Sequence, residues 1–155
     1  MFIEVPKKEI IAFDPGLSTG VVEIRGGKLT DNYTLSYDDL QEMCINQLIY
    51  PAEYVPWYNF EAWVVENYVL YPGVPQAFSD MPSSRVIGML ALTAKATKTK
   101  FILQNASNAK FFVNNDRLKE YGWWSKLGGD HERDAARHAL YYLLVSNQKE
   151  KEERL

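Results

Sequence analysis

Carboxylates end two apolar runs of this sequence, and more acids open a helical segment near its end. Asp14 closes the run at 10–13, and Glu66 closes the run at 62–65. The segment 130–134, DHERD, holds three acids and one histidine. A buried carboxylate is costly unless something positive lies beside it. The aspartate that precedes a Pro-Gly pair has a simpler interpretation, because its side chain can bond the following backbone in a turn.

These acids would do chemistry only if they met at one place. Asp14 and Glu66 would meet if their strands were neighbours, and the segment 130–134 would join them if its helix packed on the sheet. Clustered carboxylates cannot all ionise without a countercharge. Divalent cations are the usual countercharge, and oxygen ligands suit Mg²⁺. Two ions roughly 4 Å apart can hold a phosphodiester, ionise the attacking water and stabilise the leaving oxygen. The pattern therefore indicates nuclease chemistry.

The helical segment offers alternatives for its part in such a site. His131 and Asp134 are three apart and share a helix face, and small alanines at 135–136 let the helix lie close to a sheet. His131 could bind Mn²⁺, which accepts imidazole better than Mg²⁺, or could move a proton. Asp130 competes with it as a ligand, or simply caps the helix. His138 is expected to be a partly buried helix residue.

Apolar runs, turn residues and helical spacing predict the elements that position these groups. Strands are expected at 10–14, 20–24, 28–37, 62–69 and 101–103, and helices at 36–48, 83–98, 114–122 and 130–148. The other expected segments are an irregular surface connection at 51–57, a loop at 71–82, a flexible hinge at 126–129 and a charged, fraying tail at 149–155. The first three strands should form an antiparallel meander, so that the chain is an α/β protein with a five-stranded mixed sheet.

Composition places the chain among ordinary globular proteins. Its 155 residues predict one domain over 1–155, with 46% hydrophobic and 24% charged residues. No apolar run approaches the roughly 20 residues that span a bilayer, and no signal peptide is recognisable, so we expect no membrane contact and a cytoplasmic location. Cys44 is the only cysteine, which excludes an internal disulfide and a zinc finger. The net charge of −3 argues against a partner bound through general positive charge.

Three segments resemble a known family. IIAFDPGLSTGVVEI is similar to the first hairpin of the bacterial Holliday junction resolvases of the RuvC type, which belong to the ribonuclease H-like superfamily. WVVENY resembles their second acidic strand, and HERDAARHAL resembles their last helix. The order and spacing also agree, over roughly residues 8–145. The resemblance implies a ribonuclease H-like fold, with three antiparallel strands followed by two parallel ones and flanking helices, in a phage or bacterial member.

The same resemblance implies a function and a set of site residues. The metal-binding and catalytic set would be Asp14, Glu66, His131 and Asp134, with Asp130 as the alternate ligand. The implied cofactor is Mg²⁺, as two ions that Mn²⁺ can replace. The implied partner is branched DNA, a four-way junction cut by paired phosphodiester hydrolysis. Symmetric cutting needs a two-fold axis, so a homodimer is expected, with the helix at 83–98 as its contact face.

DNA contacts are expected from basic and aromatic residues. Lys110 lies where the family places a basic residue towards DNA. Further cations gather in the second half of the chain, and they are Lys95, Lys98, Lys100, Arg117, Lys119 and Lys126. Lysines at the end of a helix also suit its dipole, which is a purely structural explanation for some of them. The family tends to place a junction-wedging aromatic beyond its second acid. Tyr68 or Tyr71 would take that place here, unless both only pack.

Three other functions compete with a resolvase. A flap or fork nuclease of the same fold needs the same acids. An inert DNA-binding scaffold would keep the fold without the chemistry, but then the complete acidic set has no purpose. Sugar kinases and chaperone-type ATPases also begin with a strand followed by Asp and Gly, but they need two such domains. The sequence holds neither GxxxxGK[ST] nor GxGxxG.

Overall fold

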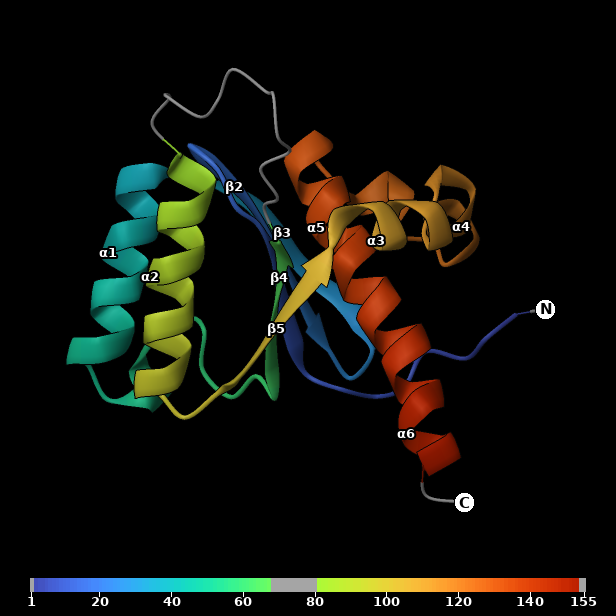
Figure 1. The fold of residues 1–155 in the computed structure, drawn as a ribbon, viewed down its shortest axis with the longest axis horizontal. Helices are drawn as coiled ribbons and strands as arrows, with labels where there is room; N and C mark the ends of the chain where they lie inside the picture. The colour runs from blue at the N-terminus through green and yellow to red at the C-terminus, as the bar shows by residue number, and fades with distance from the viewer. Residues whose placement is uncertain (1, 68–80, 154–155) are drawn as a thin grey trace.

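A mixed β-sheet separates two helical layers in the computed structural model, which describes residues 2–67 and 81–153 (Figure 1). The strands are β1 Ile10–Asp14, β2 Ser18–Arg25, β3 Lys28–Ser36, β4 Ala62–Asn67 and β5 Lys100–Asn105. The α-helices are α1 Tyr37–Ile49, α2 Pro82–Ala96, α3 Ala106–Phe112, α4 Asn115–Glu120, α5 Asp130–Tyr141 and α6 Asn147–Glu153. Helices α1 and α2 cover one face of the sheet, and α5 with α3 and α4 covers the other.

The sheet has the order β3-β2-β1-β4-β5, which confirms the expected five-stranded mixed sheet. Strands β1, β2 and β3 form an antiparallel meander, and β4 and β5 run parallel to β1. β1 is central, and its residues 10–13 are fully buried, as an uninterrupted apolar run predicts. Phe13 pairs with Val65, so the next residues, Asp14 and Glu66, lie at the same edge of the sheet.

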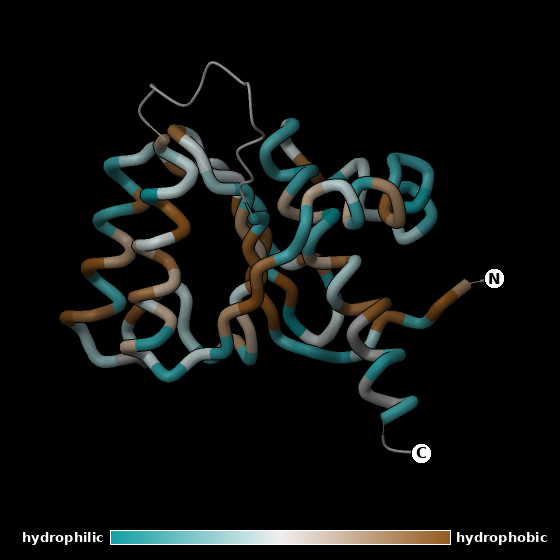
Figure 2. Tube along the Cα trace, viewed as in Figure 1, coloured by the Kyte–Doolittle hydropathy of each residue, from teal (hydrophilic) through white to brown (hydrophobic). Residues whose placement is uncertain are grey.

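Alternate side chains of the sheet enter two separate cores. One core lies between the sheet and α5, and the other lies between the sheet and the α1–α2 layer. In Figure 2 the sheet is largely brown, and teal segments lie mainly on the outer helices and loops. On α5 the residues that meet the sheet are small, namely Ala135, Ala136 and Ala139, and all three are fully buried. Small side chains let the helix axis approach the strands closely, as expected.

The segment 51–57 corrects one expectation, because part of it belongs to the core. It includes a short 3₁₀ turn at Ala52–Tyr54, but Trp57 beyond it is only 2% exposed. The Trp57 ring packs edge-on against Phe13 and Trp63, with centroid distances of 5.2 and 5.4 Å. Its indole N–H donates to the Tyr33 hydroxyl at 2.9 Å. That partner lets a buried tryptophan satisfy its polar atom, so the connection is held inside.

Helical structure also extends beyond what the sequence predicts. Residues 106–112, which have no expected element, form α3 with Asn105 as its N-cap. After α5, a π-helical turn at Tyr142–Ser146 leads into α6, so residues 149–153 of the expected tail are helical. Leu143 and Leu144 in the π-turn are nearly fully buried, so the apolar face continues past α5. None of the helices in the described ranges is long and apolar enough to cross a membrane.

Candidate active site

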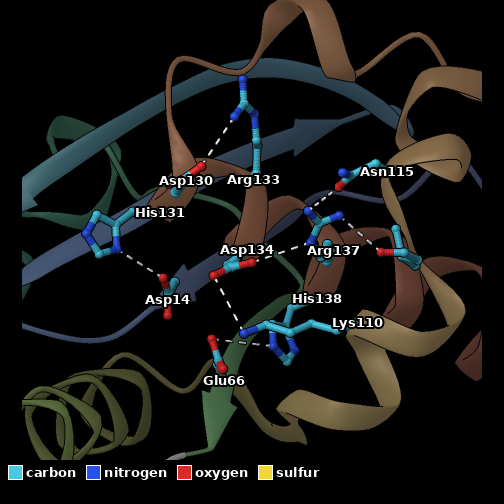
Figure 3. Close-up of polar contacts among 11 residues, drawn as sticks. Asp14, Glu66, Lys110, Asn115, Asp130, His131, Arg133, Asp134, Arg137 and His138 are labelled. Atoms are coloured by element: carbon cyan, nitrogen blue, oxygen red, sulfur yellow. Dashed lines mark hydrogen bonds and ion pairs between the residues drawn. The ribbon is translucent and has the colours of Figure 1, made fainter.

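Asp14 and Glu66 form the centre of the site, at the carboxyl ends of the neighbouring parallel strands β1 and β4 (Figure 3). Each side chain is only 15% exposed. The two carboxyls lie close enough for each to shift the pKa of the other. They line a small pocket of about 140 Å³, together with Pro15, Asn67 and Ser83.

Burial and proximity shift the pKa values of this pair upwards. Burial raises the pKa of Asp14, and the nearby charge of Asp134 adds to the rise. Burial raises the pKa of Glu66 to about 8, and the hydrogen bond with Asp14 and its charge add to that. The Lys110 ammonium opposes both shifts. Two carboxyls this close cannot both ionise easily, which is the condition that a bound cation relieves.

Helix α5 brings the remaining predicted residues to the pair. His131 Nδ1 lies 3.2 Å from Asp14 Oδ2, and the His131 side chain is 53% exposed. Asp134 is held by two cations, with its Oδ2 at 3.7 Å from Lys110 Nζ and its Oδ1 at 3.4 Å from Arg137 Nε. His131 and Asp134 therefore share the helix face that the spacing predicts, and Lys110 joins them from α3.

Asp130 lies apart from this group. Its side chain is 94% exposed and forms an ion pair with Arg133, whose Nη1 lies 3.3 Å from Asp130 Oδ1. It is the first residue of α5, and Gly129 occupies the N-cap position without a side-chain bond to the helix, so Asp130 is not the expected cap. In this structure His131, and not Asp130, faces Asp14 (Figure 3).

Gly20 sets how closely α5 can lie on the sheet. A Cβ added to Gly20 would lie 2.1 Å from the His131 carbonyl oxygen and 2.3 Å from its carbonyl carbon. Only a residue without a side chain fits there. Because Gly20 pairs with Asp14 across β1 and β2, this close approach places the start of α5 directly over the end of β1.

Asn32 on β3 holds the segment before α5. Its side-chain amide donates to the Lys126 carbonyl at 2.9 Å, and its carbonyl accepts from the Gly128 N–H at 3.1 Å. Lys126 itself ends a short 3₁₀ turn, Trp124–Lys126. The expected hinge at 126–129 is thus bonded to the sheet on both sides of Leu127, whose side chain is buried.

A buried histidine lies behind Glu66. The His138 side chain is fully buried, and its Nε2 lies 3.7 Å from Glu66 Oε2. On its other side, Nδ1 lies 2.9 Å from Oε1 of the Gln104 side chain. Burial lowers the pKa of His138 to about 4, and the positive charge of Lys110 adds to this, so the ring is neutral. The expected partly buried helix residue is in fact completely enclosed.

A wide polar cleft of about 580 Å³ lies beside the acids. It is lined by Lys110, Asn114, Asn115, Asp116, Lys119, Asp134 and Arg137. Arg137 also donates to the Val113 carbonyl at 3.2 Å and to Asn115 Oδ1 at 2.6 Å. These bonds fix its guanidinium beside Asp134. The cleft beside the acidic centre therefore carries charges of both signs, with Lys110, Lys119 and Arg137 as its cations.

Some of the predicted DNA contacts lie elsewhere. Lys100 pairs with Ala62 at the start of β4, whereas Glu66 pairs with Gln104, so Lys100 lies at the sheet edge opposite the acids. Lys95 and Lys98, at the end of α2 just before Lys100, lie at that same edge. These three lysines are therefore distant from the site. Lys126 is exposed, and its backbone carbonyl accepts from the Asn32 side chain on β3. Tyr68 and Tyr71 fall outside the described residues.

No three His, Cys, Asp or Glu side chains within residues 2–67 and 81–153 converge closely enough to hold a metal ion. Asp14 and Glu66 are paired, but Asp134 is turned towards Lys110 and Arg137. Lys110 and Arg137 thus provide the countercharge for Asp134.

Sequence reasoning overlooked several residues that shape the site. Arg137 follows Asp134 by three positions on a helix, and this spacing is a recognisable ion-pair signal. Gln104 is a polar residue near the end of an apolar strand, and this signal is also present in the sequence. Gly20 and Asn32 gave no such signal, because their contacts depend on how α5 docks.

Two of three solved structures compared with this chain share its fold. RuvC of T. thermophilus in complex with Holliday junction substrate has a TM-score of 0.68 and 14% sequence identity, covering 91% of this chain and 96% of that one. A second T. thermophilus RuvC structure has a TM-score of 0.62 and 15% identity, with the same coverage. The fowlpox virus Holliday junction resolvase has a TM-score of 0.44 and 15% identity over 92% of this chain and 99% of that one. No protein-family model and no curated protein sequence matches the chain. The resemblance to the RuvC type is thus confirmed at the level of the fold.

Proposed function

We propose that this protein is a metal-dependent endonuclease that resolves four-way DNA junctions by paired phosphodiester hydrolysis. The observation that supports it best is the pair of carboxyls, Asp14 and Glu66, at one edge of the sheet, with His131 of α5 at Asp14 and Asp134 on the same helix face. The fold shared with T. thermophilus RuvC adds to this, since that protein has been captured with Holliday junction substrate.

The chemistry of the donor groups fits hard divalent cations. Asp14 and Glu66 are paired carboxyls with raised pKa values, and the buried Glu66 Oε2 has no hydrogen-bond partner among the described residues. Asp14 and Glu66 would hold the metal. Asp134 would join them as a ligand once the metal replaced Lys110 as its countercharge. Two Mg²⁺ ions, or Mn²⁺ in their place, would supply a charge that ionises the attacking water and stabilises the leaving oxygen.

The residues of α5 and α3 take the supporting parts. We infer that His131, half-exposed and 3.2 Å from Asp14, moves a proton to or from the nucleophilic water, or binds Mn²⁺. Lys110 is placed to contact a DNA phosphate once it leaves Asp134. Lys119 and Arg137, in the same cleft, extend this phosphate-binding surface.

A homodimer would provide the second active site. Exposed apolar side chains gather on α1 and α2, at Ile45, Leu48, Ile49 and Leu92. Several of them line a groove of about 260 Å³ between the two helices, with Met89 at its edge. We propose that a second copy of the chain covers this face, because paired cuts in a symmetric junction need two sites related by a two-fold axis.

The test is cleavage of an end-labelled mobile four-way junction beside matched flap and linear duplex DNA, with Mg²⁺, with Mn²⁺ and with EDTA. We expect paired symmetric nicks on the junction that require metal. Comparable cutting of flaps would favour a broader branched-DNA nuclease. Tight junction binding without any cutting would support the inert scaffold and contradict this proposal.

A further inference from the structure

Asn32 on β3 bonds the connection before α5, residues 126–129, much as a neighbouring strand does. Its side-chain NH₂ donates to the Lys126 carbonyl at 2.9 Å, and its Oδ1 accepts from the Gly128 N–H at 3.1 Å. One partner is an acceptor and the other is a donor, so a single orientation of the amide satisfies both. Leu127 between them has extended backbone, with φ −86° and ψ 131°. One amide thus holds the backbone on both sides of one residue.

Leu127 makes this attachment specific to one register. Its side chain is 6% exposed and lies in the core between the sheet and α5. Side chains alternate across an extended segment, so a slip by one residue would turn Leu127 out of the core and put Lys126 or Gly128 in its place. The two bonds of Asn32 and the burial of Leu127 therefore favour the same single register.

This register determines which residue of α5 reaches the acids. Only Gly129 separates the bonded Gly128 from Asp130, the first residue of α5. Successive side chains of an α-helix point about 100° apart, so a shift of α5 by one residue would bring Asp130 opposite Asp14 in place of His131. Figure 3 shows that these two neighbours point in different directions, with His131 towards Asp14.

The contact of α5 with Gly20 cannot select the register by itself. It involves the backbone carbonyl of His131, and every residue has such a carbonyl. Gly20 therefore sets how deeply α5 lies on the sheet. The register must come from a contact that distinguishes one residue from the next, and Asn32 with Leu127 supplies it.

We propose that Asn32 is a positioning residue of the active site, which holds α5 in the register where His131, and not Asp130, faces Asp14. Within the described residues, the side chain of Asn32 bonds only Lys126 and Gly128. It therefore acts through the connection and not by touching the acids. The inference rests on the proposed function, in which His131 serves the attacking water.

Proton–carbon NMR of the histidine rings tests the position of His131 without metal or DNA. The chain has two histidines, so a spectrum of His131→Ala identifies the His131 signals. At one fixed pH, Asp14→Asn should shift these signals in the wild type, because Asp14 Oδ2 lies 3.2 Å from the ring. In an Asn32→Ala background, the same substitution should shift them much less. An equal shift in both backgrounds would overturn the proposal.

Thr30→Ala is the matched control. Thr30 is also on β3, and its hydroxyl donates to the Glu23 carbonyl of β2 at 3.0 Å. The control removes a bond from a side chain to a backbone carbonyl but leaves the connection intact. His131 should therefore respond to Asp14→Asn as it does in the wild type. A response lost in Thr30→Ala as well would overturn the proposal, because any weakening of β3 would then have the same effect.

Asn32→Asp gives the same NMR test in a side chain of the same shape. Its carboxylate still accepts from the Gly128 N–H but cannot donate to the Lys126 carbonyl. Thermal unfolding shows whether each variant folds, and Asn32→Asp takes the place of Asn32→Ala if the alanine variant does not. A full wild-type response of His131 in Asn32→Asp would contradict the part given to the bond with Lys126.

Cleavage rates measure the same coupling on the enzyme. Asn32→Ala should lower the rate at saturating junction about tenfold, as far as His131→Ala does, because it misplaces the same group. Junction affinity should stay unchanged, since Asn32 does not line the cationic cleft. The double variant should be no slower than His131→Ala alone. Losses that multiply in the double variant would show that Asn32 acts independently of His131, and would overturn the proposal.

Failure of the proposed function gives a different result. A wild-type protein that does not cut a four-way junction in Mg²⁺ or Mn²⁺ would refute the nuclease. The NMR comparison needs neither metal nor DNA, so it would still decide whether Asn32 places His131 against Asp14.

Discussion

Asp14 is the residue on which the proposed chemistry most depends, because it touches both the acid of β4 and the histidine of α5. We expect Asp14→Asn to abolish cleavage while leaving the fold and junction binding nearly intact. Asparagine keeps the shape of the side chain but removes the charge that attracts a metal ion. Cleavage and gel-shift assays on the same end-labelled junction measure the two effects separately. Turnover that survived the substitution would remove Asp14 from the mechanism.

The two neighbouring residues at the start of α5 should differ in importance. His131→Ala should reduce cleavage in Mg²⁺ by about tenfold or more, as the loss of a proton-transfer group does. Asp130→Ala should have little effect, because its side chain is 94% exposed and pairs only with Arg133 in the structure. Rates of both variants on one junction substrate decide the order. If Asp130→Ala reduced cleavage more than His131→Ala, Asp130 and not His131 would face the site when DNA binds, which requires α5 to turn by one residue position.

The raised pKa of Glu66 makes a prediction about stability. An unfolded glutamate ionises near its usual pKa of 4.5, whereas the folded protein retains the proton until about pH 8. As pH rises through this window, the unfolded state loses protons first, so this group makes folding less favourable. Glu66→Gln cannot ionise, and it should be more stable than wild type by about 4 kcal/mol at pH 8, with the difference vanishing towards pH 4.5.

Denaturant unfolding of both proteins across that pH range, without divalent cations, measures this difference. Added Mg²⁺ should stabilise the wild type but not Glu66→Gln, since the ion binds the folded carboxylate pair. A stability difference that stayed constant from acid to alkaline pH would contradict the raised pKa.

At the scale of elements, the close approach of α5 to β2 depends on one missing side chain. In Gly20→Ala the new methyl group would lie 2.1 Å from the His131 carbonyl oxygen, so α5 must shift. We expect a loss of about 1–3 kcal/mol in unfolding free energy, as for overpacked interiors. Because the shift also moves His131 away from Asp14, cleavage should fall strongly.

Gly88 provides the matched control for stability. It lies in the interior of α2, and an added Cβ would meet nothing within 4 Å. Gly88→Ala should therefore stabilise the helix by about 0.5–1 kcal/mol, the usual gain in helix propensity. Thermal unfolding compares the two alanine variants. If Gly20→Ala were tolerated as well as Gly88→Ala, the close contact between Gly20 and α5 would be contradicted.

Much of the architecture could be predicted from local patterns. The fully apolar run at 10–13 indicates a central strand, and the polar groups that follow it and β4 indicate the edge where a site forms. Helix α1 begins after its N-cap Ser36, whose hydroxyl accepts from the Asp39 N–H, and ends before Pro51. The types of these two residues predict both ends. These signals act within a few residues, so the sequence alone contains them.

What could not be predicted depends on contacts between distant elements. Trp57 looked like a surface residue because Pro and aromatic residues surround it, yet the sheet provides it with two rings and a hydroxyl. His138 looked partly exposed because its burial is created by β4 and β5, and not by its own helix. The lysines near the end of α2 looked like DNA contacts until the β4–β5 register placed them at the opposite edge.

At the scale of the whole molecule, the proposed DNA binding would depend on a local surface, because the protein is acidic overall. The net charge is −3, but Lys110, Lys119 and Arg137 line one cleft beside the acids. Phosphate contacts of this kind release counterions, so affinity should fall steeply with salt. Because these three cations lie in one cleft, a net negative charge is compatible with the proposed binding of DNA.

The proposed dimer gives the last prediction. Leu92 on α2 is 65% exposed beside the apolar groove between α1 and α2, so Leu92→Glu should place a charge in the contact between two copies. We expect the variant to be monomeric by light scattering, and its two cuts in a junction to become uncoupled in time. Phe2→Glu is the control, because Phe2 is 61% exposed and stacks on Tyr121, near the N-terminus on the other side of the sheet.

Phe2→Glu should retain both the dimer and the paired cuts. A cruciform plasmid reports the coupling, since simultaneous cuts give linear DNA and single cuts give nicked circles. If Leu92→Glu stayed dimeric and produced linear DNA, the contact between copies would lie on another face. If the wild type were monomeric on the junction yet still produced linear products, paired cutting would not need the two-fold axis. The oligomeric state with and without DNA therefore tests the symmetry argument separately from the chemistry of the acids.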